Sequence, residues 1–280
     1  MGKLRIPHIV GMVLAGVVIG KYGLHILERD TSFELFGKVG LYYILFLAAL
    51  EMDIEGLKKN KFRFVIFGFV TFLLPFFLTF YSSLYLLSLS PTTSLLMACI
   101  MSSHTLIGYP IVSRFGLQRK TPVMLAVGST MISLLMALLV LAAIVASSNG
   151  TSGPMFWVVF LLKFALFCCF LTLAIPRLCR WFLRRYSDSV MQFIFVLAIM
   201  FLSAALSQMI GLEGIFGAFL AGLILNRYIP SVSPLMNRLE FIGNALFIPY
   251  FLISVGMLID ITVLYKTPFV IVITTSLVFF

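Results

Sequence analysis

GMVLAG at Gly11–Gly16 recurs later in the chain as GAFLAG at Gly217–Gly222. The segments that follow the two copies also match, FLAALEMDI at Phe46–Ile54 with FLISVGMLIDI at Phe251–Ile261. Short apolar strings recur by chance, but two matches in the same order indicate an internal repeat. We therefore expect a chain built from two related groups of helices.

The composition around these motifs is that of a membrane protein. Of the 280 residues, 61% are hydrophobic and only 11% are charged, and the mean hydropathy is +1.13. A soluble domain is about half apolar and about a quarter charged, so this class is excluded. Disordered chains, collagen and disulfide-stapled secreted scaffolds are excluded by the same values. The sequence predicts an all-α polytopic protein that lies in the lipid bilayer.

Ten apolar runs predict the membrane spans, since a spanning helix needs about 20 mostly apolar residues. The fourth run contains a polar break at Ser102–Thr105, followed by Gly108 and Pro110. We expect the fourth helix to be broken at that point. The predicted spans lie at about residues 6–20, 33–50, 64–88, 92–115, 122–146, 155–176, 190–209, 212–226, 241–259 and 268–280.

The basic residues predict the orientation of these spans. Cytoplasmic loops carry an excess of Lys and Arg, and here alternate loops hold most of them. We therefore expect a protein of the cell (inner) membrane whose N-terminus is cytoplasmic. The net charge of +10 then reflects topology, and no nucleic-acid partner is expected. The basic residues of the predicted cytoplasmic loops are Lys3, Arg5, Lys58, Lys59, Lys61, Arg63, Arg114, Arg119, Lys120, Arg177, Arg180, Arg184, Arg185, Arg227 and Arg238.

The two copies of the repeat begin at the first and the eighth predicted helix, so they have opposite orientations. Inverted repeats are typical of secondary transporters, in which one bundle moves against another. We expect one transmembrane domain over residues 1–280. It would comprise a first repeat at about 6–146, a linker helix at about 155–176 and a partial second repeat at about 190–280. The repeat predicts counterparts of the fourth and fifth helices that residues 1–280 do not contain.

Polar residues inside the predicted spans are the candidates for an ion site. All ten acidic residues lie in predicted loops or at helix ends, and His104 is the only deep group that titrates near neutral pH. The fourth helix could unwind so that its hydroxyls and carbonyls hold a cation. Alternatively, the hydroxyls bond to helix carbonyls and His104 bridges two helices. The candidates are Ser102, Ser103, His104 and Thr105, with Ser129, Thr130 and Ser133 in the fifth helix.

Two further polar residues, Gln208 and Glu213, flank the turn between the seventh and eighth helices. They could line an entrance, or Glu213 could simply be a solvated helix start. Motifs of metalloproteases, intramembrane aspartyl enzymes and phosphate-binding loops do not occur in the sequence. The four cysteines have no metal-binding or disulfide spacing. We therefore expect no enzyme activity, no cofactor and no resident metal.

Several motifs in order along the chain resemble the cation:proton antiporter-2 family, the Kef-type sodium or potassium/proton exchangers. The resemblance implies an inverted-repeat sodium/proton antiporter fold with a broken helix 4, and a homodimer in which a core domain moves. It also implies exchange of a monovalent cation for protons, with no cofactor. The matching segments are 7–20, 46–53, 102–112, 216–222 and 251–260.

One position departs from the family pattern. The family usually has an aspartate in the fifth helix that binds the ion and carries the proton, and Leu134 stands there in GSTMISLL. The resemblance then leaves Ser103, Thr105 and Ser133 as ligands, and we expect His104 to be the titrating group. An alternative is a degenerate relative that does not transport and acts as a regulatory or partner subunit. A third is a channel-like derivative without proton coupling.

Overall fold

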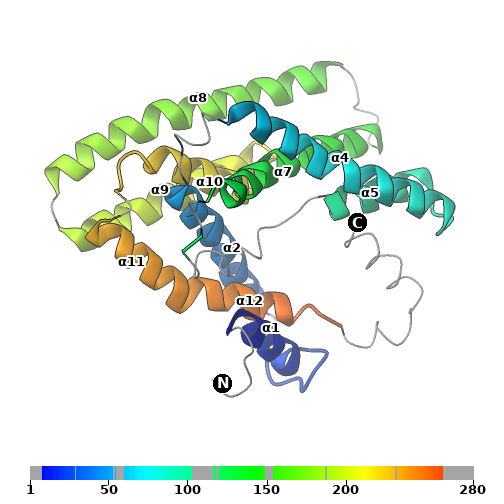
Figure 1. Ribbon diagram of the computed structural model, residues 1–280, viewed down its shortest axis with the longest axis horizontal. Coiled ribbons are helices and arrows are strands. Elements are labelled where there is room, and N and C mark those ends of the chain that lie inside the picture. The colour runs from blue at the N-terminus through cyan, green and yellow to red at the C-terminus, as the bar shows by residue number, and fades with distance from the viewer. Residues whose placement is uncertain are drawn as a thin grey trace.

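The computed structural model describes residues 8–28, 30–52, 54, 60–102, 116–117, 120–148, 154–186, 188–230 and 232–260. Within these ranges all regular elements are helices and no strand occurs, which confirms the predicted fold class. Helices lie at the first nine of the ten predicted spans (Figure 1). The tenth, at 268–280, lies outside the described residues.

Two helices extend further than the apolar pattern predicts. The sixth span continues to Arg185 instead of ending near residue 176, because arginine is a good helix former and its charge does not end a helix. The ninth begins at Pro234 instead of residue 241, where Ser233 caps it by accepting a hydrogen bond from the Met236 N–H. The elements are α1 (His8–Ile19), α2 (Thr31–Glu51), α4 (Lys61–Tyr85), α5 (Pro91–Ser102), α7 (Thr121–Ser148), α8 (Pro154–Arg185), α9 (Ser189–Met209), α10 (Gly214–Leu225), α11 (Pro234–Ile242), the π-helical η1 (Gly243–Phe247) and α12 (Ile248–Gly256).

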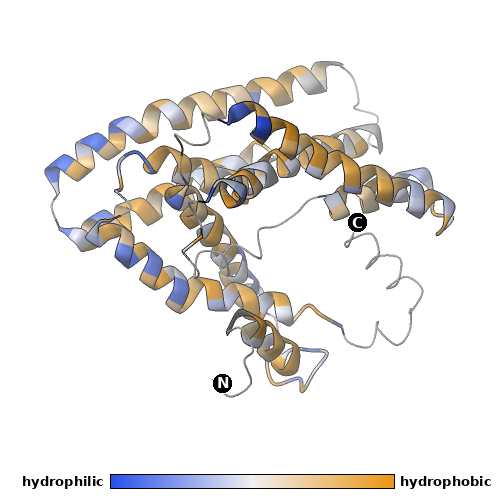
Figure 2. Ribbon diagram, in the orientation of Figure 1, coloured by the Kyte–Doolittle hydropathy of each residue, from blue (hydrophilic) through white to orange (hydrophobic). Residues whose placement is uncertain are grey.

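The surfaces of these helices are those of a multi-pass membrane protein. Among the described residues, six helical segments are long and apolar enough to cross a bilayer, and α1, α5 and α10 are shorter apolar helices. The two segments at Lys61–Tyr85 and Val158–Arg185 are the least buried of the six, although they are strongly apolar (Figure 2). Large exposed apolar faces would be unstable in water but are stable against lipid chains.

The described helices pack in two groups. In the first, α2 contacts α10 and α12, α1 lies on α12, and α8 and α9 cover α10 (Figure 1). In the second, α4, α5 and α7 pack on one another, with a small core that includes Phe72, Cys99 and Ala137. Buried residues of α7 also join an apolar cluster with α2, α10 and α12. The helix α7 therefore connects the two groups.

Glycines of the repeated motifs lie at the closest helix crossings. A Cβ atom at Gly16 would lie 3.0 Å from the Gly256 Cα and would overlap the Ile253 carbonyl oxygen. A Cβ atom at Gly222 would lie 2.7 Å from the Ala49 Cβ. The last glycine of each copy thus lets α1 cross α12 and α10 cross α2, as small residues do between membrane helices.

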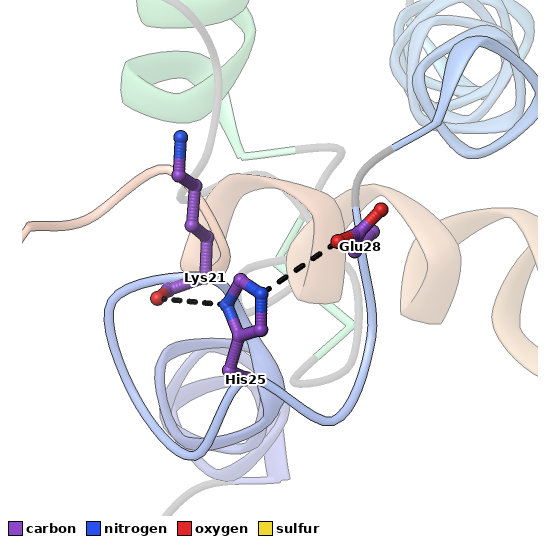
Figure 3. A network of polar contacts seen from close by, with 3 residues as sticks. All are labelled: Lys21, His25 and Glu28. Carbon is purple, nitrogen blue, oxygen red and sulfur yellow. Dashed lines mark hydrogen bonds and ion pairs between the residues drawn. The ribbon is translucent and has the colours of Figure 1, made fainter.

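The connection between α1 and α2 is closed by polar contacts (Figure 3). The His25 Nδ1 lies 3.3 Å from the Lys21 carbonyl oxygen, and its Nε2 lies 3.6 Å from the Glu28 carboxylate. His25 has a φ of 54°, a left-handed conformation that reverses the chain direction. Both contacts lie at the surface of the molecule.

Candidate ion site between α4, α5 and α7

The predicted ion-site residues fall into two sets. Ser129, Thr130 and Ser133 lie on α7, and Ser102 lies at the end of α5, where it is fully buried. The residues 103–105, including His104, lie outside the described residues, as does the rest of the predicted break in the fourth helix. The predicted roles of Ser103, His104 and Thr105 therefore stay predictions.

The Ser133 hydroxyl of α7 reaches another helix. The Ser133 side chain is 1% exposed, and its Oγ lies 3.3 Å from both the Thr71 Oγ1 and the Gly68 carbonyl oxygen of α4. Thr71 in turn donates to its own helix, at 2.8 Å from the Phe67 carbonyl oxygen and 3.1 Å from that of Gly68. Three oxygen atoms of α4 and α7 thus lie within hydrogen-bonding distance of one another in a half-buried position.

Gly68 and Thr71 are functional candidates that the sequence reasoning missed. They lie three residues apart, so they share one face of α4. Gly68 brings the two helices together, since a Cβ atom there would lie 2.8 Å from the Ile132 side chain. The signal available in the sequence was this G-x-x-T spacing inside an apolar run, opposite which a polar residue of another helix could pack.

The remaining predicted hydroxyls bond within their own helices. The Ser129 Oγ donates to the Ala126 carbonyl at 2.8 Å, and the Thr130 Oγ1 to that of Val127 at 2.7 Å. The Ser102 Oγ donates to the Cys99 carbonyl at 3.2 Å. This is the intrahelical pattern expected of hydroxyls in an apolar surrounding. Each hydroxyl oxygen keeps lone pairs that can still accept a hydrogen bond or bind a cation.

The Leu134 side chain lies in a different environment from that of its neighbour Ser133. It is 9% exposed and belongs to an apolar cluster of α7 with α2, α10 and α12 that includes Met131, Ile215 and Phe219. Ser133 contacts α4, whereas Leu134 packs on the other group of helices. The apolar residue therefore contributes to the connection between the two groups.

Gln208 and Glu213 lie where α2 meets the turn between α9 and α10. The Gln208 Nε2 donates to the Tyr42 hydroxyl at 2.6 Å, and the Glu213 carbonyl accepts a hydrogen bond from the Ser207 Oγ at 2.8 Å. The Glu213 side chain is exposed and does not cap α10. Within the described ranges no hydrogen bond or ion pair joins this pair to Ser133.

A fold-stabilising contact that the sequence reasoning missed involves Asn226. Its Nδ2 lies 2.6 Å from the Leu50 carbonyl oxygen, 2.8 Å from that of Met52 and 3.3 Å from that of Ala49. The last carbonyls of a helix have no partner within the helix, so this amide caps the end of α2. Glu51, in the same turn, is only 7% exposed.

The described chain offers no cluster of His, Cys, Asp and Glu that could hold a metal ion. Its polar groups at the α4–α7 contact are neutral hydroxyl and carbonyl oxygens, which can replace part of the water around a monovalent cation. The arrangement therefore supports ion binding better than covalent chemistry.

Comparison with known proteins identifies a family that this chain matches. The model of the family described as "Sodium/hydrogen exchanger, transmembrane" matches residues 1–280. The Na⁺/H⁺ antiporter NhaS5 of Synechocystis is 37% identical over 92% of this chain and 37% of its own length. A probable Na⁺/H⁺ antiporter 3 of Methanocaldococcus jannaschii is 31% identical over 94% of this chain and 68% of its own.

A further relative, the Na⁺/H⁺-K⁺ antiporter GerN of Bacillus cereus, is 25% identical over 91% of this chain. The chain spans 66% of the length of GerN and little more than a third of that of NhaS5. All three relatives are similar to this chain over nearly its full length.

Proposed function

Since this chain belongs to the sodium/hydrogen exchanger family, we propose that it exchanges a monovalent cation, Na⁺ or K⁺, for protons across a membrane. The observation that carries the proposal is the family match over the whole of residues 1–280. Relatives described as Na⁺/H⁺ and Na⁺/H⁺-K⁺ antiporters support it. As such a transporter, the protein needs no cofactor and catalyses no covalent reaction.

The proposed cation site is the contact of Thr71 with Ser133. Together with the Gly68 carbonyl, their oxygens form a group held between two helices, with the hydroxyl separation at 3.3 Å. Charge is costly inside a bilayer, so a cation binds there only where oxygen atoms replace its water. Ser102 and the predicted ligands Ser103 and Thr105 would complete the site from the fourth helix.

In this proposal, His104 is the residue that binds and releases the transported proton. Leu134 neither titrates nor binds a cation, so the family's carboxylate cannot supply the charge. A neutral imidazole permits a cation nearby, whereas the protonated imidazolium repels it. Because the two charges exclude each other, release of one accompanies binding of the other.

Three finer features are proposed with this function. The repeats have inverted topology, which is supported by the crossing of α1 with α12 and of α10 with α2 at equivalent glycines. The N-terminus lies in the cytoplasm of a cell whose inner membrane holds the protein, which is supported by the alternation of basic loops. The family resemblance further supports a homodimer.

The test is dissipation of a preset pH gradient in everted vesicles after addition of Na⁺, Li⁺ or K⁺. We expect the unmodified chain to dissipate the gradient. Thr71→Val should lower the rate about ten- to a hundredfold, since a contact with a charged group contributes about 1.5–3 kcal/mol and about 1.4 kcal/mol corresponds to a factor of ten. Thr172→Val is the matched control, because the Thr172 Oγ1 also donates to its own helix at 2.8 Å but is exposed on α8.

The same assay tests the coupling residue. We expect His104→Gln to flatten the pH profile of transport, because the competing proton has lost its binding group. An unchanged profile would refute the role of His104. No dissipation by inserted, folded unmodified chain would refute the transport function itself and leave the non-transporting alternative.

A further inference from the structure

The C-terminal end of α8 carries a dense basic surface. Its arginines and one tryptophan follow each other at helical spacing, so they share one face. The arginine side chains are exposed, and the five residues line a shallow hollow of about 560 Å³. Hydrophilic colour marks this end of the helix in Figure 2. This surface, the α8 arginine face, consists of Arg177, Arg180, Trp181, Arg184 and Arg185.

The positive charge of this face is not balanced nearby. Arg177 donates to the Leu173 carbonyl at 2.9 Å and Arg180 to that of Pro176 at 3.3 Å, both within α8. None of the four arginines forms an ion pair with a carboxylate among the described residues. Asp188 follows closely in sequence, but its carboxylate caps α9 by accepting from the Val190 N–H at 3.1 Å. Most guanidinium donors are therefore available to an external anion.

The length of α8 places this face at the membrane surface. Its 32 residues extend about 48 Å at about 1.5 Å per residue, whereas the hydrocarbon core is about 30 Å thick. Trp181 is 61% exposed, and such amphipathic rings favour the level of the headgroups. The opposite side is anchored on α9, because the Phe182 and Phe195 rings stack with centroids 4.0 Å apart. The arginines consequently face outward at headgroup depth.

We propose that the α8 arginine face binds the phosphate headgroup of an anionic phospholipid. A guanidinium donates two parallel hydrogen bonds to phosphate oxygens, and several on one helix face can hold one headgroup between them. Clusters of basic residues beside a membrane span are attracted to anionic lipids for the same reason. The bound lipid fixes the depth of α8 in the bilayer, next to the helices α9 and α10 that it covers.

Trp181 provides a direct reporter of this binding. The sequence contains two tryptophans, so Trp157→Phe leaves Trp181 as the sole indole. Reconstituted protein would be compared in vesicles with equal fractions of acyl-brominated phosphatidylglycerol or acyl-brominated phosphatidylcholine, which quench fluorescence on contact. We expect an apparent affinity about fivefold higher for the anionic lipid, the factor that about one basic residue at the surface supplies. Equal quenching by both lipids would overturn the proposal.

Charge-matched variants locate the binding. Changing all four arginines of the face to Gln should abolish the preference. The control variant changes Lys61, Arg63, Arg227 and Arg238 to Gln, which removes the same charge from exposed positions elsewhere. This variant should keep the preference for the anionic lipid. A preference lost equally in both would overturn the assignment to α8. Loss of quenching on adding inorganic phosphate would show a soluble anion as occupant and overturn the lipid proposal. The readout requires no transport, so its failure is distinct from failure of the proposed function.

Discussion

The side-chain amide nitrogen Nδ2 of Asn226, which directly follows α10, lies 2.6 Å from the carbonyl oxygen of Leu50 near the end of α2. The same nitrogen lies 2.8 Å from the Met52 carbonyl oxygen. An amide has two N–H donors, so both of these bonds can form together. The contact holds the C-terminal ends of two tightly packed helices together, next to the repeat motifs GAFLAG and FLAALEMDI.

We predict that Asn226→Ala lowers the free energy of unfolding by about 1–3 kcal/mol, because it leaves buried carbonyls without a donor. Asn226→Asp should cost more, since a carboxylate cannot donate to a carbonyl. Thermal unfolding in detergent measures both. Asn244→Ala is the control, since the exposed Asn244 amide bonds to the Glu240 carbonyl, one turn earlier along the same helical segment. Equal effects at the two positions would refute the capping role.

The crossing of α1 and α12 should not tolerate a side chain at Gly16. We predict that Gly16→Val destabilises the fold by at least about 1–3 kcal/mol, because overpacking must separate the two helices. Ala15→Val adds comparable bulk at an adjacent exposed position and should be nearly neutral. The stable fraction after detergent extraction, followed on heating, separates the two. Similar losses in both variants would contradict the crossing.

Tyr43 should stabilise the π-helical segment η1 between α11 and α12. Its hydroxyl donates to the Leu239 carbonyl at 2.8 Å, and its ring stacks on Phe247 of the π-helical turn at 4.5 Å. Tyr43→Phe keeps the stacking but loses the bond, so we expect a loss of about 1 kcal/mol in unfolding free energy. Tyr81→Phe, at an exposed ring on α4, is the control. An unchanged melting temperature for Tyr43→Phe would contradict the prediction.

A carboxylate at Leu134 should weaken the connection between the two helix groups. The side chain is surrounded by apolar residues such as Ile215 and Phe219, so we expect Leu134→Asp to cost several kcal/mol. Leu134→Met keeps the volume and should cost less than about 1.5 kcal/mol. Unfolding of both variants in detergent measures the difference. Stability of Leu134→Asp equal to that of Leu134→Met would show that this position has access to polar groups.

The α8 helix shows how far local pattern can predict a boundary. Its apolar run predicted a span to residue 176, yet the helix continues through the arginines to Arg185. Hydropathy detects where a chain leaves the hydrocarbon, but a helix ends only where its backbone hydrogen bonding ends. Charged residues with good helix propensity separate the two events.

The sequence by itself determined that the protein lies in a lipid bilayer, and it determined the helices and their order. The reason is that the free energy of transfer into lipid is a sum of local contributions along each apolar run. Only the tertiary structure decided that Ser133 meets Thr71, that Leu134 faces an apolar cluster and that Asn226 caps α2. In a membrane helix such as α10, apolar residues occupy all sides, so periodicity marks no inner face. Partners are chosen instead by small residues that permit close approach and by polar groups that need a donor or acceptor. Those choices depend on residues far apart in the chain, and only the packed helices bring them together.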